Sequence, residues 1–150
     1  MKTRLTFAGL PLLLFVLVAC APTAQGTTTE VSLSGAQEVP AVETSATGSA
    51  TATLSGSTLT VAGELSGLSS PVVEVAGSPG HIHQAPAGSN GDVIFPLVVS
   101  MTDDTSGTFS LSTELNAEQV TAYNAGEFYL NFHTETNQGG ELRGQIVPGM

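Results

Sequence analysis

Three histidines are the residues of this chain best suited to chemistry, and two of them stand one position apart. His81 and His83 flank Ile82, and His133 ends the run 129–133. If both runs are extended, alternate side chains share a face, so His81 and His83 point the same way. Their Cα atoms would then lie roughly 6.5–7 Å apart, close enough for two imidazoles to converge on one ion. Neutral imidazole binds Cu, Zn, Ni and Fe well, so this spacing is typical of a transition-metal site.

The use of these histidines depends on topology, because 50 positions separate His83 from His133. If the fold brings the two runs together, three imidazoles and a carboxylate can complete a metal shell, and neighbouring amides or backbone carbonyls can fix the ring tautomers. Otherwise the histidines form a structural hydrogen-bond cluster or contact a peptide, and catalysis is a third interpretation. The candidate site comprises the copper or zinc ligands His81, His83 and His133, a fourth ligand from Glu141 or Glu135, and around them Tyr129, Asn131, Arg143 and Gln145.

The N-terminal segment has the pattern of a secretion signal. Two basic residues precede an apolar run over 5–19, which is short for a membrane span. The run ends in Leu-Val-Ala before Cys20, the only cysteine. This resembles the bacterial lipoprotein signal, which implies removal of residues 1–19 and a lipid on Cys20 that anchors the protein to a membrane. Residues 20–29 then form a flexible tether, and no disulfide is possible within the fold. The alternative is an ordinary secretory peptide with an incidental cysteine.

The mature chain is expected to be strongly acidic. Removal of residues 1–19 leaves Arg143 as the only lysine or arginine beside thirteen carboxylates, so the formal net charge falls from −10 to −12. Such a surface disfavours nucleic acid and is repelled by an anionic membrane face. We expect Arg143 to brace the hairpin of the last two strands through an ion pair with Glu127, Glu135 or Glu141. The alternative role for Arg143 is to guide anions beside a metal.

Residues 30–148 favour short β-strands connected by turns. Small and β-branched residues dominate, and several runs alternate with a period of two. The runs 49–54 and 58–65 flank a Gly-containing turn, which predicts a β-hairpin. Pro96 places the apolar run 93–99 near an edge or at a bulge. The expected strands are 30–33, 49–54, 58–65, 72–75 (a short edge strand or an irregular crossing), 79–83, 93–99, 108–112, 127–134 and 141–147.

One helix is expected between Asn116 and Gly126. Asn116 can cap the free backbone N–H groups, Gln119 can reach back in a capping box, and Gly126 can end the helix. Roughly 130 residues form one domain with a single core. Many strands joined by short turns, without β/α alternation, form antiparallel folds. We therefore predict an all-β, antiparallel Greek-key β-sandwich or barrel with one short helix.

Four segments, taken in order, carry a family resemblance. They are 33–40 (LSGAQEVP), 81–83 (HIH), 125–134 (AGEFYLNFHT) and 140–146 (GELRGQI). Together they resemble the CHRD domain, which is named for its repeats in chordin, over nearly the whole of residues 30–148. The resemblance implies an all-β domain found in secreted bacterial proteins and in animal regulators of growth-factor signalling. It implies no established biochemical activity.

Enzyme motifs are sparse in this chain. The His-x-His pair before a Gly-rich loop is similar in outline to copper–zinc superoxide dismutases, but their two-metal site needs more histidines and their disulfide needs cysteines. A cupin site would need an acidic residue at a set distance after the His-x-His pair, and the sequence has none there. No EF-hand loop and no Gly-x-Ser-x-Gly motif is present. We expect a non-enzymatic binding module, secreted across the cytoplasmic membrane and lipid-anchored on the periplasmic or cell-surface side. The alternatives are a protein- or matrix-interaction module with structural histidines and, third, a superoxide dismutase-like enzyme.

Overall fold

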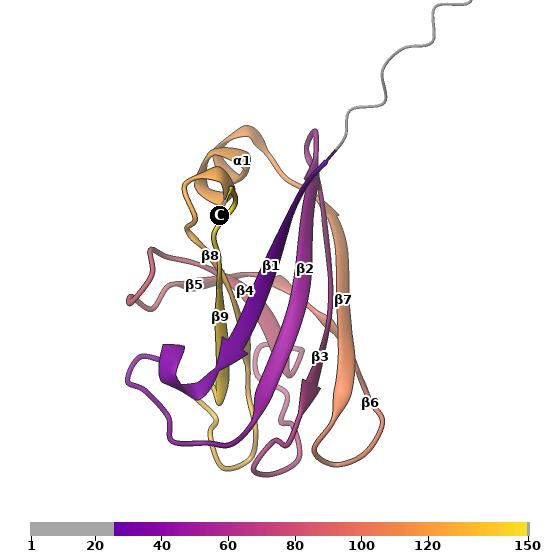
Figure 1. Ribbon diagram of the computed structural model, residues 1–150, viewed down its shortest axis with the longest axis vertical. Helices are drawn as coiled ribbons and strands as arrows, with labels where there is room; N and C mark the ends of the chain where they lie inside the picture. The colour runs from indigo at the N-terminus through magenta and orange to yellow at the C-terminus, as the bar shows by residue number, and fades with distance from the viewer. Residues whose placement is uncertain (1–25, 150) are drawn as a thin grey trace, which may run out of the picture.

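The computed structural model describes residues 26–149, and about half of these residues lie in antiparallel strands (Figure 1). The predicted all-β class with one short α-helix is confirmed, and the described residues also contain one 3₁₀ turn, directly after the first strand. The elements are β1 (Thr27–Ser34), η1 (Gly35–Gln37), β2 (Thr47–Ser55), β3 (Thr58–Ser66), β4 (Gly80–Gln84), β5 (Asp92–Pro96), β6 (Val98–Met101), β7 (Gly107–Glu114), α1 (Ala117–Asn124), β8 (Phe128–Phe132) and β9 (Leu142–Ile146).

The strands form one nearly closed, barrel-like sheet with the order β5-β4-β8-β9-β1-β2-β3-β7-β6. The register joins β1 to β9 through a single pair, Ser34 and Arg143, so two layers separate there. At the other side only Leu97 lies between β5 and β6, and the chain crosses from one layer to the other. The expected strand 93–99 is therefore two strands, and Pro96 stands at the corner.

The layer β1-β2-β3-β7 follows the predicted alternation. β2 and β3 form the expected hairpin, and the turn uses Gly56 at φ 62°, a conformation that favours glycine. One face of these strands is buried and the other is exposed to solvent. The buried side chains of β1, β2 and β3 include Val31, Leu33, Ala50, Ala52, Leu54, Leu59, Val61 and Leu65.

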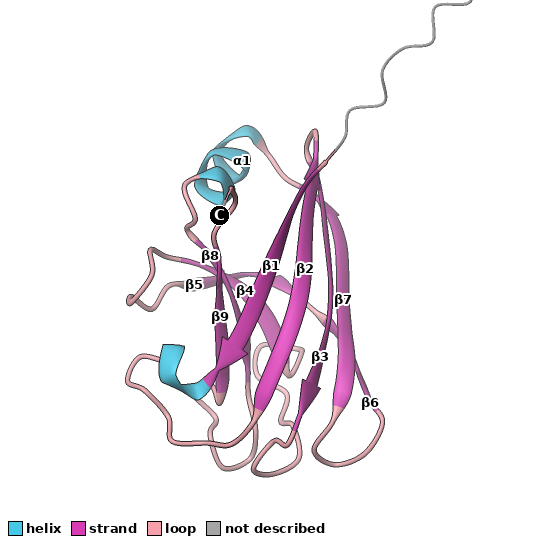
Figure 2. Cartoon of the chain, viewed as in Figure 1, coloured by secondary structure: helices cyan, strands magenta, loops and turns pink. Residues whose placement is uncertain are grey.

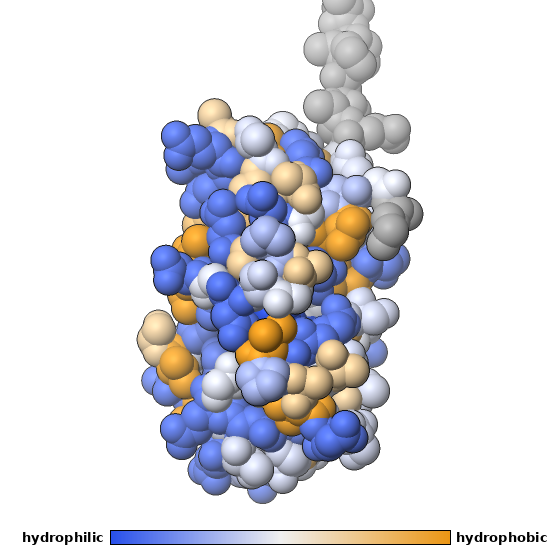
Figure 3. All heavy atoms as spheres, turned by 90° about the vertical axis from the view of Figure 1, so that its left-hand side faces the viewer, coloured by the Kyte–Doolittle hydropathy of each residue, from blue (hydrophilic) through white to orange (hydrophobic). Residues whose placement is uncertain are grey.

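The layer β4-β8-β9 is buried on both faces. Its inner face joins the core, where Phe132 of β8 meets Phe109 of β7 with ring centroids 4.6 Å apart. Its outer face is polar, and two connecting segments, 35–46 (which begins with η1) and 85–91, lie over it (Figure 2). Residues of β9 form hydrogen bonds with both segments. Figure 3 views this side of the molecule, which is largely hydrophilic with small, separate apolar patches.

The predicted boundaries hold within a few residues. The capping box of α1 is present between Asn116 and Gln119, and Gly126 follows at φ 74°. β1 begins at Thr27, three positions before the expected domain start, and the segment 72–75 is an irregular crossing with isolated bridges. Among the described residues, no helix is long and apolar enough to span a membrane. The expected signal peptide and Cys20 lie outside the described residues.

Candidate metal centre

Strand pairing brings the three histidines together. β4 and β8 are antiparallel neighbours, with His81 opposite Asn131. His133 follows β8 directly, and its backbone N–H donates to the carbonyl of Pro79 at 2.9 Å, which continues the ladder. On its other side β4 has a register shift against β5 just before His83, and such bulges re-aim side chains. The pairing of β4 with β8 thus bridges the 50 positions that separate the histidines in sequence.

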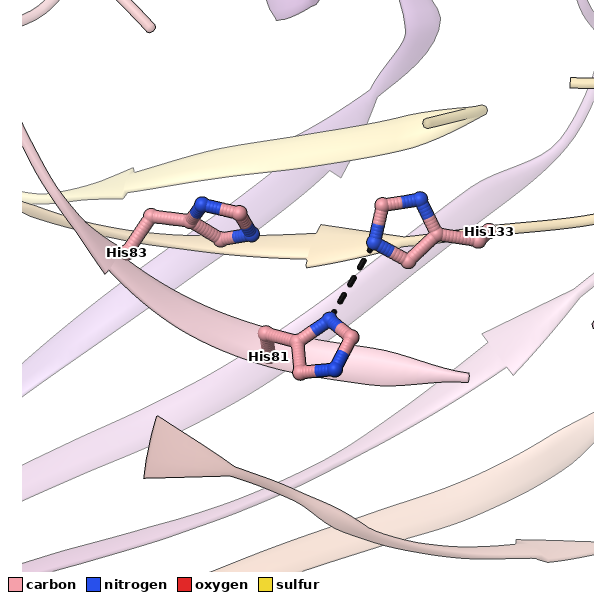
Figure 4. A group of neighbouring side chains, drawn as sticks. All are labelled: His81, His83 and His133. Carbon is pink, nitrogen blue, oxygen red and sulfur yellow. Dashed lines mark hydrogen bonds between the residues drawn. The ribbon is translucent and has the colours of Figure 1, made fainter. Parts of the chain in front are cut away.

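The three rings face a common space, as Figure 4 shows. One ring nitrogen from each of His81, His83 and His133 lies within 4.8 Å of the others. The shortest approach is 3.2 Å, between His81 Nδ1 and His133 Nε2. The exposed fractions of the residues are 0, 8 and 4%, so the cluster lies inside the protein and not on an open sheet face. The predicted gathering of all three histidines is confirmed.

Backbone carbonyls fix two of the rings. His83 Nδ1 donates to the carbonyl of Gly91 at 2.9 Å, and His133 Nδ1 donates to the carbonyl of Gln138 at 3.0 Å. A carbonyl only accepts, so the protons lie on these Nδ1 atoms and the Nε2 lone pairs face inward. Among the described residues, His83 Nε2 and His81 Nε2 are buried without a hydrogen-bond partner. Buried polar atoms normally have partners, so these nitrogens need an explanation.

Burial keeps the histidines neutral. It is the largest cause that lowers the pKa of all three rings, and for His133 it brings the pKa to about 4. The other rings add to this effect: His83 lowers the pKa of His81, and His81 lowers that of His133. The backbones of Val75, Gly91 and Gln138 oppose part of the shift. At neutral pH the cluster is therefore in the form that ligates metals.

Comparison with known families now identifies the domain. The family model for the CHRD domain matches residues 29–146, which include all three histidines. The chain belongs to the CHRD domain family. Comparisons with curated proteins and with solved structures found no match. The resemblance inferred from the four sequence segments is thus confirmed.

An aromatic stack supports the His83 side of this CHRD domain. The ring of Tyr129 stacks on His83 with centroids 4.9 Å and planes 13° apart, and the guanidinium carbon of Arg143 lies 3.6 Å from the Tyr129 centroid. The Tyr129 hydroxyl accepts from the N–H of Gly91 at 3.1 Å. Tyr129 therefore holds both the ring of His83 and the residue whose carbonyl fixes its tautomer.

The other polar residues predicted around the site act on the backbone. Asn131 donates to the Gly139 carbonyl at 3.4 Å, and Gln145 donates to two carbonyls, Ala85 at 3.1 Å and Gly126 at 2.7 Å. Gln145 thereby connects β9 to the start of the segment 85–91. The tautomers of His83 and His133 are fixed by backbone carbonyls and not by neighbouring side-chain amides.

Arg143 is buried, with 1% of its surface exposed, and its partners differ from those expected. In place of an ion pair with Glu127, Glu135 or Glu141, its guanidinium donates to the Ser89 carbonyl at 2.8 Å, to Asn90 Oδ1 at 3.2 Å and to Gln145 Oε1 at 3.3 Å. Ser89 and Asn90 belong to the loop after β4. No periodic pattern in the sequence predicts that this loop lies over β9.

The carboxylates considered as fourth ligands lie apart from the histidine cluster. Glu135 is exposed. Glu141 is buried, and its oxygens accept from Thr44 Oγ1 at 2.7 Å, from the N–H and Oγ of Ser69 at 2.9 and 2.8 Å, and from Thr134 Oγ1 at 2.8 Å. Burial raises the pKa of Glu141, but these hydrogen bonds outweigh burial and leave the pKa below its usual value. Its oxygens are thus engaged in structural hydrogen bonds.

Glu38 is a buried carboxyl that the sequence reasoning missed, although it lies in the family segment 33–40. Burial raises its pKa to about 7, against the opposing charge of Arg143 and the backbone of Val39. Glu38 Oε1 and Asn131 Oδ1 are buried and without partners among the described residues. A Cβ added at Gly140 would collide with both oxygens, so both lie beside Gly140.

Proposed function

We propose that this CHRD domain is an extracytoplasmic, lipid-anchored module that binds one transition-metal ion, copper or zinc, through His81, His83 and His133. The observation that carries the proposal is the convergence of three buried ring nitrogens within 4.8 Å of one another. One of the converging nitrogens, His83 Nε2, is buried without a hydrogen-bond partner among the described residues. Leaving such a group unsatisfied costs about 1–3 kcal/mol, which a bound ion would recover.

The geometry of the rings is close to that of a ligated ion. Metal–nitrogen bonds of about 2.0–2.1 Å in a trigonal set place the nitrogens roughly 3.5 Å apart. His81 Nδ1 and His133 Nε2 are already 3.2 Å apart, and one nitrogen from each of the three rings lies within 4.8 Å of the others. Metal-bound histidines commonly donate their second N–H to a carbonyl, as His83 and His133 do here. Burial of the ligands supports binding in preference to catalysis.

Metal titration of the purified protein tests the proposal. We expect one ion per chain by elemental analysis and calorimetry. His81→Gln, His83→Gln and His133→Gln each remove a ligand and should weaken binding by about 100-fold or more. Gln84→Ala changes the exposed end of β4 and serves as the matched control, with unchanged affinity. Absence of stoichiometric copper and zinc from the folded wild-type protein would overturn the proposal.

The membrane anchor rests on the sequence of residues 1–20, with Cys20 as the lipidated residue. In the native host, wild-type protein should be found in the membrane fraction and incorporate a labelled fatty acid. Cys20→Ser should move it to the soluble fraction, with the metal affinity of the domain unchanged. Soluble, unlabelled wild-type protein would contradict the anchor and leave the metal site standing.

A protein-contact role is the second candidate, favoured by exposed apolar residues on edge strands. Val93 of β5 is 40% exposed and Val98 of β6 is 68% exposed. Exposed edge strands are common sites of contact with other chains. A partner retained after replacement of all three histidines would favour this role, whereas a partner lost on chelation of the metal would unite the two candidates.

A further inference from the structure

The donors that converge on the common space carry no charge. The cluster consists of three imidazoles and contains no carboxylate or thiolate among the described residues. Glu135 is exposed to solvent, and the oxygens of Glu141 already accept four hydrogen bonds elsewhere. A metal bound here would keep its full formal charge inside the protein. The cost of burying an ion rises with the square of its charge, so a divalent ion is penalised far more than a monovalent one.

The positive charge of Arg143 adds to this penalty, and the opposing effect of Asp92 on His83 is smaller. The Arg143 guanidinium lies 3.6 Å from the Tyr129 centroid, and the Tyr129 ring is stacked on the ligand ring of His83 at 4.9 Å. Arg143 has no carboxylate among its hydrogen-bond partners, which are a backbone carbonyl and two side-chain amides. Its positive charge therefore raises the potential on the His83 side, and this repels a dication more than a monocation.

The number of donors also favours a monovalent ion. Structural Zn²⁺ sites are four-coordinate and tetrahedral, and many include charged ligands. Here three nitrogens converge, and the exposed fractions of 0, 8 and 4% leave little access for a water ligand. Cu(I) has a filled d shell and accepts three nitrogen donors without a fourth ligand.

We propose that the three-histidine cluster is selective for Cu(I) over Cu(II) and Zn(II). This inference rests on the proposed function, because it specifies which ion the same site takes. The neutral donor set, the buried setting and the adjacent guanidinium all act in one direction. The module would thus hold reduced copper and discriminate against divalent ions of similar ligand preference.

Two measurements on the wild-type protein test the selectivity. The first is anaerobic competition with a chromophoric Cu(I) chelator and, separately, with a Zn(II) indicator, which gives the ratio of the two affinities. The second is the reduction potential of bound copper against copper in excess imidazole at the same pH. A 100-fold preference for Cu(I) over Cu(II) raises that potential by about 120 mV. X-ray absorption should show three nitrogen neighbours around copper.

A charge variant sharpens the test. His133→Asp replaces a neutral donor by an anion and should lower the Cu(I)-to-Zn(II) affinity ratio by at least tenfold, whereas Gln84→Ala should leave the ratio unchanged. If His133→Asp does not fold, the wild-type potential still decides. Zn(II) or Cu(II) bound as tightly as Cu(I) by wild-type protein overturns the selectivity and leaves the metal site intact. No binding of any of the three ions overturns the site as well.

Discussion

The outer faces of the two layers are both polar, but only one is in water. On the outer face of β1-β2-β3-β7, side chains such as Thr51 and Thr60 are exposed. On the outer face of β4-β8-β9, His81, Tyr129 and Arg143 are buried under the segments 35–46 and 85–91. Polar residues in water need no partner from the protein, whereas buried ones do. The chemistry of this domain is therefore concentrated where loops cover a polar face.

The covering segment 85–91 and the connection between β8 and β9 take part in the site directly. The Gly91 carbonyl orients His83, the Gln138 carbonyl orients His133, and the Ser89 carbonyl accepts from Arg143. Such carbonyls have fixed positions once the loop is folded, so they determine which ring nitrogen carries a proton. The difference between the layers is thus one of loop coverage more than of strand composition, and it can be broken experimentally.

The largest effect is expected from a matched pair of substitutions on the two outer faces. Arg143→Ala removes a buried guanidinium with three hydrogen-bond partners and a ring contact, and should lower the free energy of unfolding by roughly 3–5 kcal/mol. Thr60→Ala changes an exposed position of β3 and should change it by less than about 0.5 kcal/mol. Urea denaturation of both variants measures the difference, and equal losses would show that the two faces are equivalent.

Strand pattern and local capping accounted for most of the fold. The alternation in β2 and β3, the Gly56 turn and the Asn116–Gln119 capping box are local features, and the sequence predicted each. The crossing at Leu97 was missed as a strand boundary because an apolar run reads the same within one strand or across two. The change of layer between β5 and β6 can be recognised only when the positions of both layers are known.

The candidate site was predicted in part. The shared face of His81 and His83 follows from alternation, and the approach of His133 from the pairing of β4 with β8. The partners of Arg143 and the separate role of Glu141 could not be predicted. Arg143 is satisfied by a distant loop, and Glu141 stands one residue before β9, where strand alternation no longer sets the direction of a side chain. Both depend on long-range contacts that local pattern does not encode.

The next effect concerns the pH dependence of the metal-free protein. Burial lowers the pKa of His133 to about 4, below the ordinary value of 6.5, so the unfolded chain binds the proton first as pH falls. Stability from neutral His133 is therefore complete above about pH 6.5 and is lost as pH falls towards 4, by roughly 2 kcal/mol. Wild type and His133→Gln, compared by denaturation at several pH values, should differ less at pH 4 than at pH 7.5. A constant difference would show that His133 titrates normally.

Two buried carboxyls next to the covered layer, Glu38 and Glu141, offer a comparison of opposite sign. Glu38 has a pKa raised to about 7, so its stability contribution is present below about pH 4.5 and is lost as pH rises through 7. Glu38→Gln should therefore stabilise the protein at pH 8 by roughly 1–3 kcal/mol and have little effect near pH 4. Glu141 has a lowered pKa and accepts four hydrogen bonds as an anion. Glu141→Gln should destabilise the protein at pH 8 by about 1–3 kcal/mol. Thermal melts of both variants at pH 8 decide the signs, and shifts in the same direction would contradict the assignment.

The smallest effect is expected from Tyr129→Phe, which isolates the link between the covering loop and the ligand His83. The substitution keeps the ring that stacks on His83 and removes only the hydroxyl that accepts from the Gly91 N–H. Loss of one neutral hydrogen bond should lower the free energy of unfolding by about 1 kcal/mol. Because the Gly91 carbonyl holds His83 Nδ1, a looser loop should also weaken metal binding by a few fold, well below the loss caused by removing a ligand. Metal titration and denaturation of the same preparation separate the two consequences. A stability loss with unchanged metal affinity would mean that the loop covers the site without orienting it.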